Sequence, residues 1–254
     1  MILYMKIYFG KCNIPYCPQK LNNKDTKILN AVISKTIKNK TDDWYIKHLD
    51  YLVSIQKTLL SYPNYNYFEI FGSKNHLELF KLEDEKIKSI QIYLNFLLNK
   101  YKDINKIDQE SITKIYHKFK NIILFIKDYI NDPRPYQILY YFKDIKLNVY
   151  HSVSSQTGSS PSGHCFSGFL EGYLIYISNE KFFDNNLYEF NRLLDIMIDI
   201  GLHRCMTGIH FMYDNYLSYI VFIEILKEYN YNLNNKYITE LKKRLKNIFL
   251  ESID

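Results

Sequence analysis

His210 and Asp214 are four residues apart, the spacing that places two side chains on one face of a helix. A carboxylate that accepts a hydrogen bond from one ring nitrogen fixes the histidine tautomer and leaves the other nitrogen as a nucleophile or a base. Arg204, six residues before His210, offers a planar fork that matches two oxygens of a phosphoryl group. The alternative for His210 and Asp214 is a surface ion pair, which contributes little to stability.

A second segment, residues 158 to 164, reads Gly-Ser-Ser-Pro-Ser-Gly-His and lies where we expect a helix to begin. A loop of small residues that leads into a helix exposes consecutive backbone N–H groups, and the helix dipole adds positive potential there. Gly163 lets the backbone approach an oxygen closely, and His164 then projects from the first turn toward the bound anion. The alternative is that Ser162 is an ordinary N-cap and that His164 is incidental.

A third segment supplies two cations at the end of a predicted helix. Lys127 falls in the last turn of that helix, and Arg134 lies on the rigid exit between Pro133 and Pro135. Two cations presented from a helix end and a stiff loop can converge on one anion. The alternative is that Lys127 only complements the negative end of the helix dipole.

In chain order the three segments read K-x6-R-P, P-S-G-H and R-x5-H-x3-D. This ordered set resembles the type 2 phosphatidic acid phosphatase superfamily, which also contains bacterial non-specific acid phosphatases and vanadium haloperoxidases. The resemblance covers about residues 127 to 214, whereas the first 110 residues resemble no family. Because the sequence lacks apolar stretches that span a membrane, it is more similar to the soluble acid-phosphatase branch than to the lipid phosphatases.

The resemblance implies an all-helical fold and a metal-independent phosphoric monoester hydrolase that forms a phosphohistidine intermediate and needs no cofactor. It assigns phosphate binding to Lys127, Arg134, Ser162, Gly163 and Arg204, and it assigns catalysis to His210 as nucleophile, His164 as general acid and Asp214 as the partner of His210. It also implies a small phosphorylated substrate, diphosphates included, and association into a homo-oligomer. The particular substrate is not encoded in these motifs.

One position departs from the family pattern. The family usually has serine directly before the arginine of the third motif, and this sequence has His203. A bulkier imidazole reshapes the pocket or adds a cation, which leaves a non-catalytic helical protein that binds phosphorylated ligands as an alternative. A vanadate-dependent haloperoxidase is a further alternative, disfavoured because two of the four cysteines adjoin site residues and are sensitive to oxidation.

The elements that must position these residues are predicted to be helices. Glycine and proline are scarce, with 8 and 6 residues, and few forced turns favour long helices over short strands. We expect an all-α fold, a single-domain helical bundle of about ten helices, with residues 1–110 packed on a catalytic core of residues 111–254. Helical periodicity covers residues 26–60, 77–101, 112–130, 161–177, 187–203, 209–228 and 235–249. Residues 1–25, 62–75 and 150–160 are predicted to be irregular, and Asp108 is predicted to begin the cap of the helix over 112–130.

Charge and hydropathy limit the partners. The net charge of +6 is dispersed, so it can attract a phosphorylated substrate but does not indicate nucleic-acid binding. Uncharged apolar stretches of about 18 residues, which a spanning helix requires, are absent from the sequence. The first residues also lack a convincing signal peptide. We therefore expect a cytoplasmic protein without an integral membrane anchor.

The four cysteines do not indicate a disulfide scaffold in a chain of this length. Cys12 and Cys17 lie close together without a second pair or a nearby histidine, so a metal site there is not expected. Cys165 and Cys205 directly follow site residues and are predicted to be small buried side chains, with oxidative control as the alternative. The aromatic residues after Arg134 are predicted to pack in the core or to line an entrance for a leaving group; they are Tyr136, Tyr140, Tyr141 and Phe142.

Overall fold

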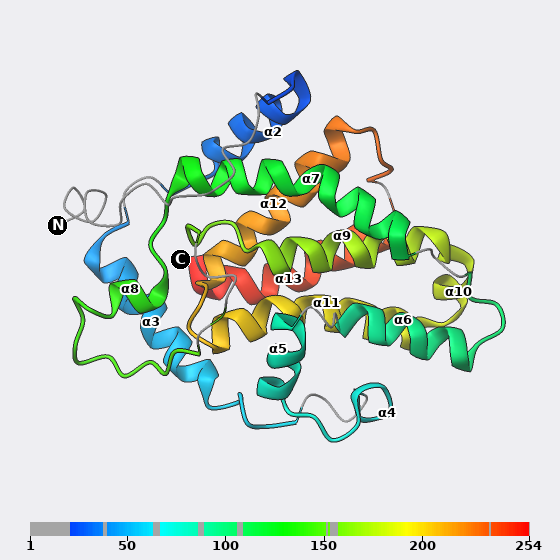
Figure 1. The fold of residues 1–254 in the computed structure, drawn as a ribbon, viewed down its shortest axis with the longest axis horizontal. Helices are drawn as coiled ribbons and strands as arrows, with labels where there is room; N and C mark the ends of the chain where they lie inside the picture. The colour runs from blue at the N-terminus through cyan, green and yellow to red at the C-terminus, as the bar shows by residue number, and fades with distance from the viewer. Residues whose placement is uncertain are drawn as a thin grey trace.

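The computed structural model describes residues 21–37, 40–62, 67–85, 89–105, 109–150, 152, 157–233 and 235–253. The regular elements in these residues are all helices, as predicted, and they form a bundle (Figure 1). In chain order they are α2 (Asn23–Ser34), α3 (Asp42–Gln56), α4 (Phe68–Phe71), α5 (His76–Asp84), α6 (Ser89–Lys100), α7 (Gln109–Ile130), α8 (Pro135–Ile138), α9 (Gly163–Ser178), α10 (Glu180–Asn185), α11 (Leu187–Met206), α12 (Met212–Glu228) and α13 (Lys236–Ile253).

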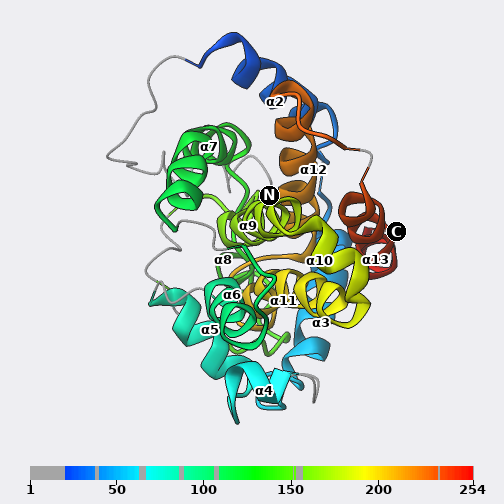
Figure 2. The same cartoon turned by 90° about the vertical axis from the view of Figure 1, so that its right-hand side faces the viewer.

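Helix α9 occupies the centre of the bundle and is surrounded by α7, α11, α12 and α6 (Figure 2). Most of its side chains are buried, as expected for a helix that is apolar on all sides. It approaches α11 closely, because a Cβ atom at Gly172 would lie only 1.6 Å from the sulfur of Met197. The helix that begins with the predicted anion-binding residues is therefore also the central packing element.

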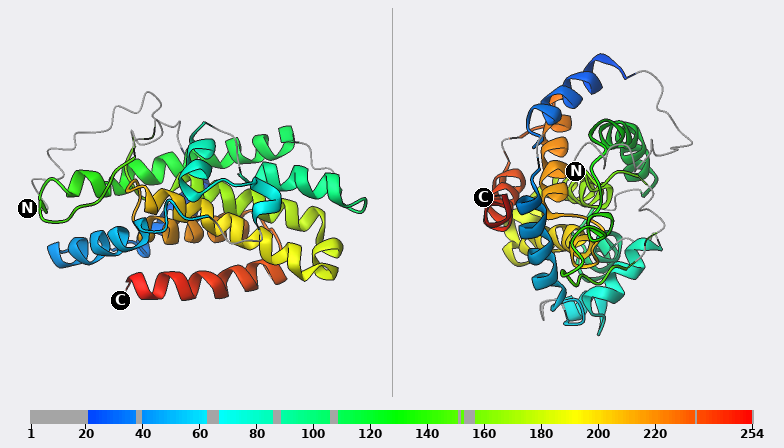
Figure 3. Two further views of the ribbon diagram at one scale, coloured as in Figure 1. Left: turned by 90° about the horizontal axis from the view of Figure 1, so that it is seen from below. Right: turned by 90° about the vertical axis from the view of Figure 1, so that its left-hand side faces the viewer.

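The N-terminal helices pack on the same core as the rest of the chain. Helix α2 lies along α12, where Lys35 pairs with Glu224 at 3.1 Å, and α3, α5 and α6 contact α11. Buried residues of α2, α3, α6, α9, α11 and α12 belong to one continuous hydrophobic cluster. Helix α13 covers one side of this bundle and contacts α11 and α12 (Figure 3).

Several helix boundaries differ from the prediction, and local caps explain two of them. The stretch 26–60 forms two helices, because the Thr41 side chain accepts a hydrogen bond from the Trp44 N–H and begins α3. The stretch 77–101 likewise divides into α5 and α6, where Asn75 and Glu78 form a capping box at the start of α5. Within the predicted loop 62–75 lies the single turn α4, and α10 lies between the predicted helices over 161–177 and 187–203. Asp108 and residues 1–20 lie outside the described part of the chain.

The predicted end of α7 at Asn131 is confirmed. Asn131 has a φ of 47°, the left-handed conformation that commonly ends a helix, and Pro133 and Pro135 follow it. Pro135 then begins the short helix α8, a position where the missing N–H of proline has no helical partner to lose. Across the described residues, none of the helices is both long and apolar enough to cross a membrane.

Candidate active site

The predicted site residues lie at one end of the bundle, where two helices end and two begin (Figure 1). Lys127 is in the last turn of α7 and Arg204 in the last turn of α11. Ser162 caps α9, and Asp214 is in the first turn of α12. Cations thus lie at the negative helix ends, and the positive ends of α9 and α12 lie close by, an arrangement that favours an anion.

His210 and Asp214 form a buried pair. Nδ1 of His210 lies 3.0 Å from Oδ2 of Asp214, and both residues are at most 3% exposed. The surface ion-pair alternative is therefore wrong. The geometry assigns the Nδ1 proton to the bond with Asp214, which leaves the lone pair on Nε2.

The prediction that His210 and Asp214 share a helix is wrong, because α12 begins only at Met212. Gly208 has a φ of 72°, a conformation that glycine adopts readily, and it turns the chain after α11. The N–H groups of Ile209 and His210 then both donate to the carbonyl of Arg204 at 3.1 Å. This turn, rather than helical periodicity, places the imidazole beside Asp214.

Asp214 accepts more hydrogen bonds than the sequence predicts. The hydroxyls of Ser159 and Ser160 donate to its two carboxylate oxygens, and the N–H of Phe211 donates to Oδ2 at 2.9 Å. Ser159 Oγ also lies 3.4 Å from Nδ1 of His210. The only feature of the sequence that could have indicated these two serines is their position directly before Pro161. They hold the carboxylate that orients the candidate nucleophile.

These contacts determine the charge states of the pair. Burial acts to raise the pKa of Asp214, but the hydrogen bond and charge of His210, the charge of Lys40 and the Ser159 hydroxyl lower it overall. Burial, together with the charge of Arg134, lowers the pKa of His210 to about 3. At neutral pH the carboxylate is therefore ionised and the imidazole is neutral, the form in which Nε2 is a nucleophile.

Arg134 and Lys127 enclose the loop that carries the small residues. Arg134 Nη1 lies 3.4 Å from Nε2 of His210 and donates to the carbonyl of Ile209 at 3.1 Å, while its Nε donates to Thr157. Lys127 Nζ donates to the carbonyls of Gly158 and Ser159 at 2.8 and 2.9 Å. Both cations thus contact the same loop, and Arg134 also lies close to the candidate nucleophile.

The loop approaches α7 closely at Gly158, where a Cβ atom would lie 2.9 Å from the carbonyl oxygen of Lys127. Ser162 is the N-cap of α9, since its hydroxyl accepts a hydrogen bond from the N–H of Cys165. Gly163 is the first helical residue, and the space where its Cβ would be is open. His164 follows it in the first turn and is half-buried. The open space therefore adjoins the two residues of the P-S-G-H segment that were expected to approach an anion.

The Arg204 side chain contacts residues of α5. Its Nη1 donates to Oδ1 of Asp84 at 3.2 Å, and its guanidinium lies 4.5 Å from the ring centre of Phe80. Burial lowers the pKa of Arg204, while the charges of Glu83 and Asp84 act in the opposite direction. Arg204 joins the His210 cluster through its backbone carbonyl. Asp84 lies 120 residues away in the chain, so no spacing rule could predict this contact.

A further cation reaches the site from the N-terminal region. Lys40 Nζ lies 2.5 Å from Oδ2 of Asp132, and it is also near the ring centre of Tyr213 at 4.6 Å. The backbone carbonyl of Asp132 accepts a hydrogen bond of 2.9 Å from the N–H of Ser159. Lys40 therefore stabilises the loop of the first motif, and sequence reasoning did not identify it.

Cys165 and Cys205 are both buried and unoxidised, and Asn215 Nδ2 lies 3.2 Å from the sulfur of Cys205. Burial raises the pKa of each thiol well above its usual value, which keeps both protonated and unreactive. This favours the interpretation as small core residues over oxidative control. Cys12 and Cys17 lie outside the described residues.

The aromatic residues after Arg134 divide into two groups. Tyr140 is 75% exposed and Tyr141 is 37% exposed, whereas Phe142 packs against the core cluster. Tyr136 is half-buried. The core interpretation is therefore wrong for Tyr140 and Tyr141.

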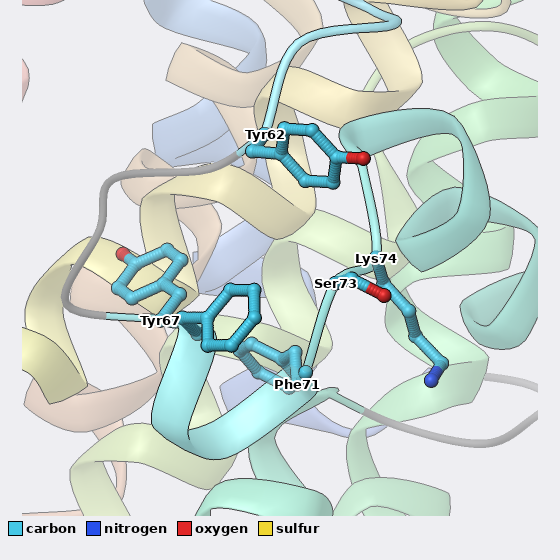
Figure 4. Close-up of a pocket in the computed structure, with 7 residues that line it drawn as sticks. Tyr62, Tyr67, Phe71, Ser73 and Lys74 are labelled. Atoms are coloured by element: carbon cyan, nitrogen blue, oxygen red, sulfur yellow. The ribbon is translucent and has the colours of Figure 1, made fainter.

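A cavity of about 420 Å³ lies elsewhere, against the short helix α4. Figure 4 shows the rings of Tyr62, Tyr67 and Phe71 around it, with Ser73 and Lys74 at its edge. None of the predicted site residues lines this cavity. Within the described ranges, no group of three or more His, Cys, Asp or Glu side chains could hold a metal ion.

Comparisons with models of protein families, with curated proteins and with solved structures give no match to this chain. Membership of the type 2 phosphatidic acid phosphatase superfamily is therefore a proposal, and its support comes from the three ordered motifs and from the geometry around His210.

Proposed function

We propose that this chain is a metal-independent phosphatase of the type 2 phosphatidic acid phosphatase superfamily that hydrolyses phosphomonoesters through a phosphohistidine at His210. The observation that carries the proposal is the buried pair of His210 and Asp214, with the unprotonated Nε2 facing the Arg134 guanidinium at 3.4 Å. In-line attack on a phosphoryl group requires an unprotonated nucleophile with a cation close by to bind the phosphoryl oxygens, and Nε2 and Arg134 supply these two groups.

In the proposed first step, Nε2 of His210 forms a bond to phosphorus while the bond to the leaving oxygen breaks. Positive charge develops on the imidazole, and the Asp214 carboxylate stabilises it through the Nδ1 hydrogen bond. His164, in the first turn of α9, protonates the departing oxygen. The neutral His164 then takes a proton from water, which attacks phosphorus and releases His210 and inorganic phosphate.

Charge on the equatorial oxygens of the phosphoryl group needs positive partners that are already in place. Lys127 and Arg134 lie at the same loop, and the first N–H groups of α9 adjoin the open space at Gly163. Arg204 joins them from the end of α11. These groups supply the stabilisation that phosphoryl transfer requires without a metal ion.

The proposal is tested by release of inorganic phosphate from p-nitrophenyl phosphate and from nucleotides, sugar phosphates and diphosphates. We expect His210→Ala to abolish turnover, whereas His117→Ala, at an exposed histidine of α7, leaves it unchanged. Rapid quenching in base should trap a phosphohistidine, which is labile in acid. Full activity of His210→Ala would exclude the proposed nucleophile.

A second candidate is a helical protein that binds phosphorylated ligands without turnover. The ion pair of Arg204 with Asp84 favours it, because the arginine that catalysis would use to bind phosphate is already paired with a carboxylate. This candidate predicts that the protein binds inorganic phosphate in calorimetry. It also predicts that the protein neither hydrolyses p-nitrophenyl phosphate nor forms phosphohistidine. A trapped phosphohistidine on His210 would rule it out.

A further inference from the structure

One face of α5 is directed at the end of α11 that carries His203 and Arg204. His76, Phe80, Glu83 and Asp84 follow one another at spacings of four, three and one, which place them on neighbouring positions of one helical face. All four contact His203 or Arg204. Helix α5 thus presents a ring, a histidine and two carboxylates to the last turn of α11.

The two carboxylates hold one edge of the Arg204 guanidinium. Asp84 Oδ1 accepts from Nη1 at 3.2 Å, and Glu83 Oε2 lies 3.9 Å from Nη2. Phe80 packs against the flat face of the group at 4.5 Å. The side chain of Arg204 is 0% exposed, so its orientation is determined by these neighbours.

The side edge of the same guanidinium has no hydrogen-bond partner within the described part of the chain, although it shares Nη2 with the edge that Glu83 approaches. Nε and Nη2 are buried and have no hydrogen-bond partner among the described residues. These two nitrogens form the side fork of arginine, which matches two oxygens of a phosphoryl group. Buried donors without a partner are destabilising, so an anion that reaches the fork and accepts from both nitrogens is bound favourably.

Glu83 is itself held by a hydrogen-bonded chain. Ser89 Oγ donates to Oε1 of Glu83 at 2.7 Å, and Nδ1 of His203 lies 3.2 Å from the same oxygen. The other ring nitrogen of His203 lies 3.0 Å from Nδ1 of His76. His203, the position that departs from the family pattern, therefore contacts the carboxylate rather than the expected phosphate site.

The charges along this chain are consistent with those contacts. Burial acts to lower the pKa of His203, but the charges of Glu83 and Asp199 and the hydrogen bond to Glu83 raise it overall. Burial lowers the pKa of His76 to about 4, with the charge of His203 acting in the same direction. A charged His203 donates from both nitrogens, to Glu83 and to a neutral His76 that accepts.

We propose that Glu83 and Asp84 are positioning residues that hold the Arg204 guanidinium at Nη1 and Nη2 and thereby direct its Nε and Nη2 fork at the phosphoryl group. His203 in turn holds the Glu83 carboxylate in place. This inference deepens the proposed function and depends on it for the phosphoryl ligand. Neither carboxylate touches substrate. Both act through Arg204.

The experiment measures binding of inorganic phosphate by calorimetry, together with kcat and KM on p-nitrophenyl phosphate. The variants are Glu83→Gln, Arg204→Ala and the double variant, with Glu85→Gln as the control because Glu85 is the exposed carboxylate directly after Asp84. We expect Glu83→Gln to weaken phosphate binding and kcat/KM by about tenfold or more, as for the loss of a charged hydrogen-bond partner. We expect the double variant to be no weaker than Arg204→Ala alone, because Glu83 acts only through the arginine.

Losses that add in the double variant would overturn the inference, and so would phosphate binding by Glu83→Gln equal to that of wild type. Absence of phosphate binding in the wild-type protein would overturn it as well. The proposed function has a separate readout, since His210→Ala should lose turnover and still bind phosphate. If Glu83→Gln does not fold, Asp84→Asn at the half-buried second carboxylate makes the same test with the same expected tenfold loss.

Discussion

The backbone N–H of Ser162 donates a hydrogen bond of 3.1 Å to the carbonyl oxygen of Asp214. This bond joins the start of α9 to the first turn of α12. The carbonyls of Ser162 and Asp214 share the single hydroxyl proton of Ser218, whose Oγ lies 2.8 Å from the first and 2.7 Å from the second. The two helix starts that carry His164 and the partner of His210 are therefore held in a fixed register.

Removal of the Ser218 hydroxyl should loosen this register. Ser218 is completely buried, so Ser218→Ala leaves two carbonyls with one donor fewer and should lower the free energy of unfolding by about 1 kcal/mol. The loss is measured by urea denaturation against Ser54→Ala, at an exposed serine of α3. Equal midpoints for the two variants would contradict this role of the hydroxyl.

Replacement of the Asp214 carboxylate should affect catalysis far more than substrate binding. Asp214→Asn keeps the shape but loses the charge that stabilises the imidazolium, and its amide group meets the donors Ser159, Ser160 and Phe211. We expect kcat to fall by about 10²–10⁴-fold with a smaller change in KM. Steady-state kinetics measure this, with Asp128→Asn, at an exposed aspartate of α7, as the control. A fall in KM alone would not fit the proposed role.

The lowered pKa of His210 predicts a pH dependence of stability. Its folded-state value of about 3 is below the ordinary value of 6.5, so below pH 6.5 the unfolded chain binds a proton that the folded protein does not. Stability from this residue is therefore complete above pH 6.5 and is lost as the pH falls. The loss should approach about 1.4 kcal/mol per pH unit relative to His210→Asn.

Urea denaturation of wild type and His210→Asn between pH 7 and pH 5 tests this slope, because the Asp214 carboxylate stays ionised in that range, given its lowered pKa. The stability difference between the two proteins should shrink, or change sign, as the pH falls. Parallel profiles would show that the imidazole takes up its proton while the protein is still folded.

The buried pair of Lys40 and Asp132 should be strongly coupled. Lys40→Met leaves the Asp132 charge in a largely buried position, where breaking a pair costs about 3–5 kcal/mol. The double variant with Asp132→Leu should recover part of that loss, because no unpaired charge remains. Unfolding midpoints measure the cycle, and Lys47→Met, at an exposed lysine of α3, is the control. Additive losses would mean that the two charges do not interact.

Much of the site was predictable because its residues are close together in the sequence or lie at predictable helix ends. The proline pair after Asn131 predicted the end of α7, and the small residues before His164 predicted the start of α9. The contact between His210 and Asp214 was also predicted, although the helix expected to carry both residues begins only at Met212, after His210. Local chemistry, namely a cap, a proline or a left-handed residue, carries this information.

The contacts that the sequence did not predict are those between segments far apart in the chain. Asp84 and Arg204 are 120 residues apart, and Lys40 and Asp132 are 92 apart, so no spacing rule connects them. Single-sequence periodicity detects which face of α5 is polar, but it does not identify the helix that this face contacts. The direction of the Arg204 side chain could therefore be obtained only from the packing of α5 on α11.

The chain of contacts from Ser89 through Glu83 to His203 and His76 has a consequence for how this sequence can change over generations. A lineage that replaces Glu83 alone removes the carboxylate that contacts Nδ1 of the buried His203 and leaves Arg204 with Asp84 as its remaining ion-pair partner. A change at position 83 is therefore expected together with a change at position 203, whose imidazole also contacts His76. Relatives of this protein that carry serine at position 203 should accordingly differ at both of these α5 positions, so that the three residues are inherited as one set.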